Sequence, residues 1–139
     1  MLGHAIVLDT CALRDKVFMD WLKGYTGDIR IPPVVYMEMC RQQTERGLPV
    51  AELDEWLRIK NISVLRFDKN DARIAAELMA GRGSKPCGKC GKMDWFDAIV
   101  ASHFDKGDYL ITNNRDGFPT SGVFEGRILT TDEFMSRRH

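Results

Sequence analysis

The stretch that decides the fold is His4-Ala5-Ile6-Val7-Leu8-Asp9, a short and nearly continuous apolar run that ends in a carboxylate. A run of this kind is typical of a strand buried on both faces of a parallel sheet. In open α/β sheets, ligands bind at the carboxyl ends of the central strands. Asp9 is therefore a candidate site residue. Asp9 and Thr10 are also good caps for a following helix, and position alone does not separate the two roles.

Strand-like and helix-like segments alternate through the rest of the chain. Strands are predicted at 28–31, 62–67, 108–112 and 126–129, and helices at 11–23, 33–46, 51–60, 68–81, 93–104 and 130–138. The helical segments repeat apolar residues at helical spacing, and Gly or Pro follows several of them. The alternation predicts a three-layer α/β/α domain with a mostly parallel central sheet and right-handed crossovers. A length of 139 residues suits a single domain over residues 1–139.

The composition narrows the functional classes. Hydrophobic residues make up 44% of the chain, which predicts a globular protein, and 20 Lys and Arg balance 20 Asp and Glu. A neutral balance gives no global attraction to nucleic acid, so a polyanion would need a local basic patch. No stretch approaches the roughly 20 apolar residues of a transmembrane helix. No signal-peptide pattern stands at the start, so we expect a cytoplasmic protein without membrane contact.

Two carboxylates, Asp94 and Asp97, stand at the start of the helix predicted at 93–104. The apolar stripe of that helix consists of Phe96, Ile99, Val100, His103 and Phe104. At helical period Asp94 points away from this stripe and is a good N-cap, whereas Asp97 lies on its edge. There Asp97 either favours the helix dipole or reaches a cleft. We expect His103 to be a satisfied core residue.

Glu38, inside an apolar helical run, and Asp116, after the strand at 108–112, complete a set of four acids with Asp9 and Asp97. Each has an ordinary explanation; Glu38, for instance, suits an exposed helix position. If the first strand and the strand at 108–112 are neighbours, the acids meet at one edge of the sheet. Crowded carboxylates raise each other's pKa values, and a divalent cation removes that conflict. Oxygen ligands without a supporting histidine fit Mg²⁺ or Mn²⁺.

Four segments of the chain resemble the PIN-domain ribonucleases and follow one another in that family's order. The resemblance is greatest to the small single-domain VapC-type toxins. The segments are Val7–Thr10, Ile31–Glu38, Asp97–Ala101 and Leu110–Phe118. The resemblance implies a PIN-like fold with Asp9, Glu38 and Asp97 as an acidic metal-binding core. It implies Thr10 as a helper whose hydroxyl orients a carboxylate or a water. The implied chemistry is hydrolysis of RNA phosphodiester bonds with one or two Mg²⁺ or Mn²⁺ ions, which leaves a 5′-phosphate and a 3′-hydroxyl.

The chain departs from this family at the fourth acid. Such proteins often carry Asp two residues after the Thr that ends the late strand, and here Asn114 stands two residues after Thr112. We expect Asp116 to be the fourth acid, with Asn114 and Asp94 as auxiliary residues. The resemblance also implies a homodimer and, for a toxin, a small antitoxin protein that blocks the cleft.

A basic segment at 82–92 leads into the helix of Asp97 and contains no acid. Its cations are candidate contacts to RNA phosphates, and a merely solvated loop is an equal alternative. These cations are Arg82, Lys85, Lys89 and Lys92.

The four cysteines are expected to be thiols or metal ligands, because disulfides are rare in the cytoplasm. Cys87 and Cys90 resemble one knuckle of a zinc ribbon, but a structural Zn²⁺ takes four ligands and a second such pair is missing. We favour two reduced thiols over a Zn²⁺ site or a redox pair. Cys11 and Cys40 are expected to pack as small hydrophobes.

These patterns predict a metal-dependent endoribonuclease, either the toxin of a toxin–antitoxin pair or an RNA processing or decay nuclease. The alternative is a non-catalytic module that binds RNA or protein on a PIN-like fold, and the weak fourth acid favours it. A third interpretation is a hydrolase of small phosphate esters that uses the same acids. Cleavage that requires both a metal and Asp9 separates the first from the second.

Overall fold

The sheet is built around β1 (Ile6–Leu8), whose three side chains are fully buried. Apolar side chains on both faces make this strand the centre of a parallel sheet. It pairs in parallel with β2 (Ile29–Ile31) on one side and with β4 (Tyr109–Ile111) on the other. The computed structural model describes residues 3–81, 94–119 and 122–137.

Within these residues five strands form one sheet in the order β3-β2-β1-β4-β5, and every pairing is parallel. The edge strands are β3 (Ile62–Val64) and β5 (Ile128–Leu129). The predicted α/β/α fold is confirmed, including the expectation that the first strand and the strand near 110 are neighbours. The strand order reverses at β1, because β2 and β3 lie on one side of it while β4 and β5 lie on the other. Open α/β sheets bind ligands at such a point.

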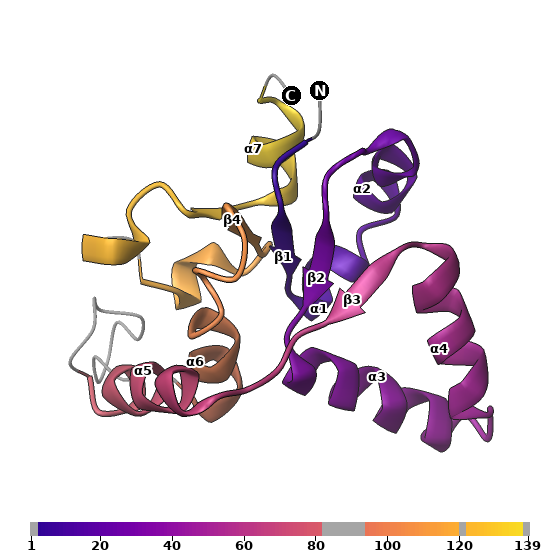
Figure 1. Ribbon diagram of the computed structural model, residues 1–139, viewed down its shortest axis with the longest axis horizontal. Coiled ribbons are helices and arrows are strands. Elements are labelled where there is room, and N and C mark those ends of the chain that lie inside the picture. Colours follow the sequence, from indigo (N-terminus) through magenta and orange to yellow (C-terminus); the bar gives the residue numbers. More distant parts are fainter. Residues whose placement is uncertain (1–2, 82–93, 120–121, 138–139) are drawn as a thin grey trace.

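Helices pack on both sides of the strands (Figure 1). One pair is α3 (Pro33–Glu45) with α4 (Val50–Ile59), and the other is α5 (Lys69–Met79) with α6 (Trp95–Ala101). Proline is favoured in the first turn of a helix, and α3 begins at Pro33. In the described ranges, no helix is long and apolar enough to cross a membrane.

The prediction of a single helix at 11–23 is wrong. The structure has two short helices, α1 (Thr10–Leu13) and α2 (Lys16–Trp21), followed by the 3₁₀ turn η1 (Leu22–Gly24). Asp15 separates them, because its carboxylate caps α2 by accepting the N–H of Phe18 at 3.1 Å. The break turns Val17 to solvent, where 70% of the residue is exposed. Val17 follows Leu13 by four positions and precedes Trp21 by four, so helical spacing alone places it on the core side.

The helix predicted at 93–104 ends earlier, at Ala101. The N–H groups of His103 and Phe104 donate to carbonyls three residues back, which is the tighter 3₁₀ pattern. The predicted stripe stays covered, since His103 and Phe104 are both buried. His103 is satisfied as expected, with Nδ1 2.8 Å from the carbonyl oxygen of Ile99 and Nε2 3.2 Å from that of Arg66.

The C-terminal part closes the sheet beside β4. Two 3₁₀ turns, η2 (Arg115–Gly117) and η3 (Gly122–Phe124), lead to β5 and then to α7 (Thr131–Met135). Phe134 of α7 is fully buried and packs edge-on against the ring of Phe18 in α2. The short α7 is therefore held by tertiary packing as well as by its cap.

Candidate active site

Asp9 directly follows β1 and caps α1, so the capping role is confirmed, and its role as a site residue stays a prediction. Its carboxylate is 5% exposed and accepts the backbone N–H of Thr10 at 2.7 Å. It also accepts the hydroxyl of Thr112 at 2.9 Å. Thr112 directly follows β4, so the parallel pairing of β1 with β4 brings this donor to Asp9.

Glu38 lies in the second turn of α3 and reaches back toward α1. One carboxylate oxygen accepts the hydroxyl of Thr10 at 3.2 Å, and the other accepts the Arg14 guanidinium at 3.2 Å. The side-chain amide of Gln42, one turn later in α3, lies 3.5 Å from Glu38. Thr10 therefore links two acids, because its N–H binds Asp9 and its hydroxyl binds Glu38.

Asp97 occupies the first turn of α6, a helix that packs against α3. Asp94 caps this helix and accepts the N–H of Asp97 at 2.9 Å. Burial raises the pKa of Asp97 to about 7, and the charges of Asp94 and Asp9 add to the effect. Asp97 thus lies close enough to Asp9 for their charges to interact.

The pKa of Asp9 is raised as well, mainly by burial and in smaller part by the charge of Glu38. The hydrogen bonds from Thr112 and Thr10 oppose this rise, because they favour the charged carboxylate. Asp9 is therefore the central member of the group: it interacts electrostatically with Glu38 on one side and with Asp97 on the other.

This carboxylate cluster (Asp9, Glu38 and Asp97) fits a hard divalent cation by its chemistry. As the side chains stand, no group of three or more His, Cys, Asp or Glu in the described parts of the chain is arranged to hold a metal ion. The donors are nevertheless carboxylate oxygens whose charges conflict, and a cation such as Mg²⁺ or Mn²⁺ relieves that conflict.

The predicted fourth acid makes no contact with this cluster within the described residues. Asp116 is exposed in η2, and its side chain makes no hydrogen bond or ion pair within the described residues. Asn114, also exposed, donates its backbone N–H to the hydroxyl of Thr112 at 3.1 Å. The roles assigned to Asp116 and Asn114 stay predictions.

The basic and cysteine residues of the segment 82–92 lie outside the described residues. The predicted RNA contacts and the predicted thiol pair stay predictions. These residues are Arg82, Lys85, Lys89, Lys92, Cys87 and Cys90.

Cys11 has a different environment from the one expected. Its thiol lies 3.5 Å from the Asp9 carboxylate and 3.3 Å from the Thr112 hydroxyl, and it accepts the N–H of Asn113 at 3.1 Å. Burial, with the charge of Asp9 added, raises the pKa of this thiol. Cys11 is therefore a neutral, hydrogen-bonded neighbour of the cluster, whereas Cys40 packs against the core as predicted.

Sequence reasoning named Thr10, whose hydroxyl does contact a carboxylate, but missed the other residues that contact the acids. Thr112 donates to Asp9, and Arg14 and Gln42 contact Glu38. The available signals were weak: Thr112 ends a predicted strand, and Gln42 lies four positions after Glu38 on a helix. Both arrangements are compatible with many other contacts.

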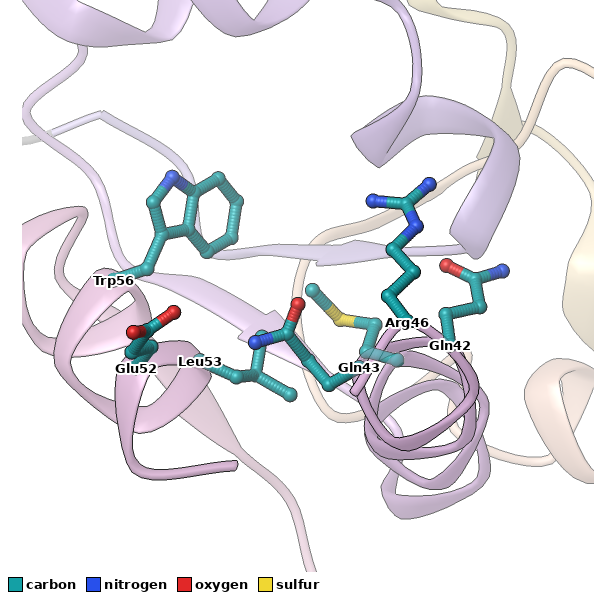
Figure 2. Close-up of a pocket in the computed structure, with 7 residues that line it drawn as sticks. Gln42, Gln43, Arg46, Glu52, Leu53 and Trp56 are labelled. Atoms are coloured by element: carbon teal, nitrogen blue, oxygen red, sulfur yellow. The ribbon is translucent and has the colours of Figure 1, made fainter. Parts of the chain in front are cut away.

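Two cavities adjoin α3. The larger, of about 610 Å³, lies between α3 and α6 at the carboxylate cluster and is lined by Met37, Glu38, Arg41, Trp95 and Phe96. The other, of about 350 Å³, lies between α3 and α4; Figure 2 shows that Gln42, Gln43 and Arg46 project from one helix and Glu52, Leu53 and Trp56 from the other. None of the three acids lines this second cavity.

The chain belongs to the PIN domain family, whose model matches residues 6–120. A comparison with curated proteins gives no match. PIN domains are generally metal-dependent nucleases, so family and fold together define a hydrolase of the nuclease class. The predicted family resemblance is confirmed at this level.

Proposed function

We propose that this protein is an endoribonuclease that depends on Mg²⁺ or Mn²⁺. The observation that carries the proposal is the electrostatic coupling of the carboxylate cluster. Asp9, Glu38 and Asp97 come from three different elements. The charge of Glu38 raises the pKa of Asp9, and the charge of Asp9 raises that of Asp97. Holding such charges together is unfavourable, and a bound divalent cation relieves the repulsion.

In this mechanism Asp9, Glu38 and Asp97 hold the ion, and Asp116 with Asn114 completes the set. When bound, such an ion would supply a water of lowered pKa and would neutralise charge on the scissile phosphate. Thr10 fixes Asp9 and Glu38 relative to each other, and Thr112 orients the Asp9 carboxylate. Asp97, in the first turn of α6 and close enough to Asp9 for their charges to interact, is the proposed acceptor of the water's proton.

Three more specific proposals concern the kind of PIN protein, its partners and its contact with RNA, and they rest on the family match more than on the site. Within the PIN family we assign this chain to the VapC-type toxins, as one PIN-like domain that forms a homodimer and is blocked by a small antitoxin. The basic segment at 82–92 is the proposed contact to RNA phosphates, which makes binding sensitive to salt.

The test is cleavage of a panel of single-stranded and structured RNAs with Mg²⁺ or Mn²⁺. We expect cleavage to stop with EDTA and to fall on the order of 100-fold or more in Asp97→Asn, the range for loss of a catalytic acid or base. Asp20→Asn is the matched control, because Asp20 is an exposed acid on α2. Cleavage that survives EDTA or Asp97→Asn contradicts the proposal.

A second candidate is a non-catalytic RNA-binding module. The exposure of Asp116, which contacts none of the three acids within the described residues, favours it, because an incomplete acid set holds a metal less well. Such a module binds RNA without cutting it, and binding survives both EDTA and Asp9→Asn. Hydrolysis of a small phosphomonoester but not of RNA would instead identify a phosphatase-like use of the same acids.

A further inference from the structure

The cavity between α3 and α6 opens directly beside the carboxylate cluster. Glu38 belongs to both, and Trp95 in the cavity wall stands two residues before Asp97 on α6. A ligand bound in this cavity therefore lies next to any phosphate held by the cluster.

The wall of this cavity exposes large apolar side chains. Trp95 and Met37 are each 52% exposed, although both are residue types that usually lie inside. Trp95 packs against Phe96 in an edge contact, with ring centroids 6.1 Å apart, and half of the tryptophan stays accessible. An accessible indole beside a phosphate-cleaving site is a platform on which a nucleobase stacks.

Arg41 adds a positive charge to the same cavity. Its side chain is 64% exposed and, among the described residues, pairs with Glu45 at 3.6 Å one turn along α3. A guanidinium binds phosphate oxygens in a two-pronged fashion, and an exposed partner is easily exchanged. The cavity therefore combines a stacking surface with a phosphate ligand, the two features that a nucleotide requires.

We propose that this cavity takes one unpaired base of the RNA, next to the bond that is cut. The base stacks on Trp95, and Arg41 binds an adjoining phosphate. The inference rests on the proposed function, whose substrate it narrows to single-stranded RNA. The volume of about 610 Å³ lies in the usual range for small-ligand sites, about 300–1,000 Å³. Bases within an RNA duplex are already stacked and paired, so they do not enter.

The binding test uses short single-stranded RNA oligonucleotides in EDTA, which prevents cutting, and follows tryptophan fluorescence. We expect RNA to quench the wild-type protein, and we expect Trp95→Ala to lose this quenching and bind roughly tenfold more weakly, the size of one base–aromatic stack. Trp95→Phe keeps a ring and should retain most of the affinity. Trp56→Ala is the matched control, since it removes the tryptophan of the other cavity. A perfectly paired duplex should quench little.

Cleavage with Mn²⁺ then separates the two proposals. If Trp95→Ala cuts single-stranded RNA with wild-type kcat/KM, the base site is overturned and the nuclease stands. If even the wild-type protein fails to cut, but RNA quenches it through Trp95, the base site stands and the nuclease fails. Equal quenching of wild type and Trp95→Ala, or no quenching at all, overturns the base site and leaves the exposed Trp95 and Met37 as a protein contact. Circular dichroism checks that Trp95→Ala is folded.

Discussion

Threonine hydroxyls contact two acids of the candidate site, and the Arg14 guanidinium contacts Glu38 as well. Thr112 donates to Asp9, and Thr10 donates to Glu38. Hydrogen bonds to the charged form of a carboxylate oppose the rise in pKa that burial causes. Asp9 thereby stays available as an anionic ligand although it is 5% exposed. A cation in place of these hydroxyls would compete with a metal for the same oxygens.

Thr112 offers a direct test of this arrangement. Its side chain is fully buried and serves both Asp9 and the backbone of Asn114. We expect Thr112→Val to lower the free energy of unfolding by about 1–2 kcal/mol, because buried polar groups lose their partner. Metal-dependent cleavage should fall as well. Urea denaturation and RNA cleavage measure the two effects.

Thr112→Ser is the matched control, since it keeps the hydroxyl and loses one methyl group. It should retain most of the activity. If Thr112→Val matched the wild-type protein in both assays, the hydroxyl would have no role in holding Asp9.

At the scale of elements, residues distant in the sequence hold the break between α1 and α2 in place. Asp15 accepts the hydroxyl of Thr131 at 2.7 Å and the side-chain amide of Asn113 at 3.2 Å. Three elements thereby meet at one carboxylate: the start of α2, the end of β4 and the start of α7. Periodicity carries no information about such partners, which is why the sequence predicted one continuous helix.

The turn η2, which carries Asp116, is fastened to α7 by Arg115 and Glu133. Glu133 also closes the capping box of α7 by accepting the N–H of Thr130 at 2.9 Å. The backbone of Thr130 and then the charge and hydrogen bonds of Arg115 hold the pKa of Glu133 below its ordinary 4.5.

This lowered pKa predicts a pH-dependent contribution to stability. Because the folded value is the lower one, Glu133 stabilises the fold above about pH 4.5, and the contribution is lost as the pH falls through the folded value. We expect the difference in unfolding free energy between wild type and Glu133→Gln to shrink over this range. The side chain is 40% exposed, so solvent screening keeps the difference under about 1 kcal/mol.

Urea denaturation of both proteins at a series of pH values measures this difference. Asp132→Asn, which changes the neighbouring exposed acid of α7, is the control. A difference that stays constant from pH 7 to pH 3 would show that Glu133 acts by packing alone.

At the scale of the whole molecule, most of the fold was predictable from local signals. Short apolar runs such as Ile6–Leu8 identify buried parallel strands, and Pro33 marks the start of α3. Asp9 was proposed from the rule that ligands gather at the carboxyl edge of the sheet. Glu38, Asp97 and the helper Thr10 came from the family resemblance, and the contacts of Thr112, Arg14 and Gln42 were not predicted. Outside the site, Asp71 is a fully buried acid 3.5 Å from Lys106, and nothing in its helical surroundings distinguished it from an exposed cap.

The carboxylate cluster also leads us to expect that a bound metal raises the stability of the whole protein. A metal that binds the folded state alone raises the unfolding free energy, by about 2.7 kcal/mol at 100 times its dissociation constant. We expect Mn²⁺ to raise the melting temperature of the wild-type protein by several degrees. Asp97→Asn should melt at or above the wild-type temperature in EDTA, because it removes a charge beside Asp9 and Asp94. It should then gain little from Mn²⁺.

Thermal unfolding by circular dichroism, with EDTA and with Mn²⁺, measures these shifts. Asp20→Asn should respond to Mn²⁺ as the wild-type protein does. An equal rise in Asp97→Asn and wild type would place the metal elsewhere.

The pairing of β1 with β4 has a consequence for the timing of synthesis. Asp9 is translated early, but the hydroxyl that orients it belongs to Thr112, 103 residues later in the chain. Loop closure over such a distance makes this contact late in folding. A chain that has emerged only as far as β4 therefore lacks the hydroxyl that orients Asp9. Under the proposed function, RNA cleavage that depends on this contact begins only after Thr112 has been made.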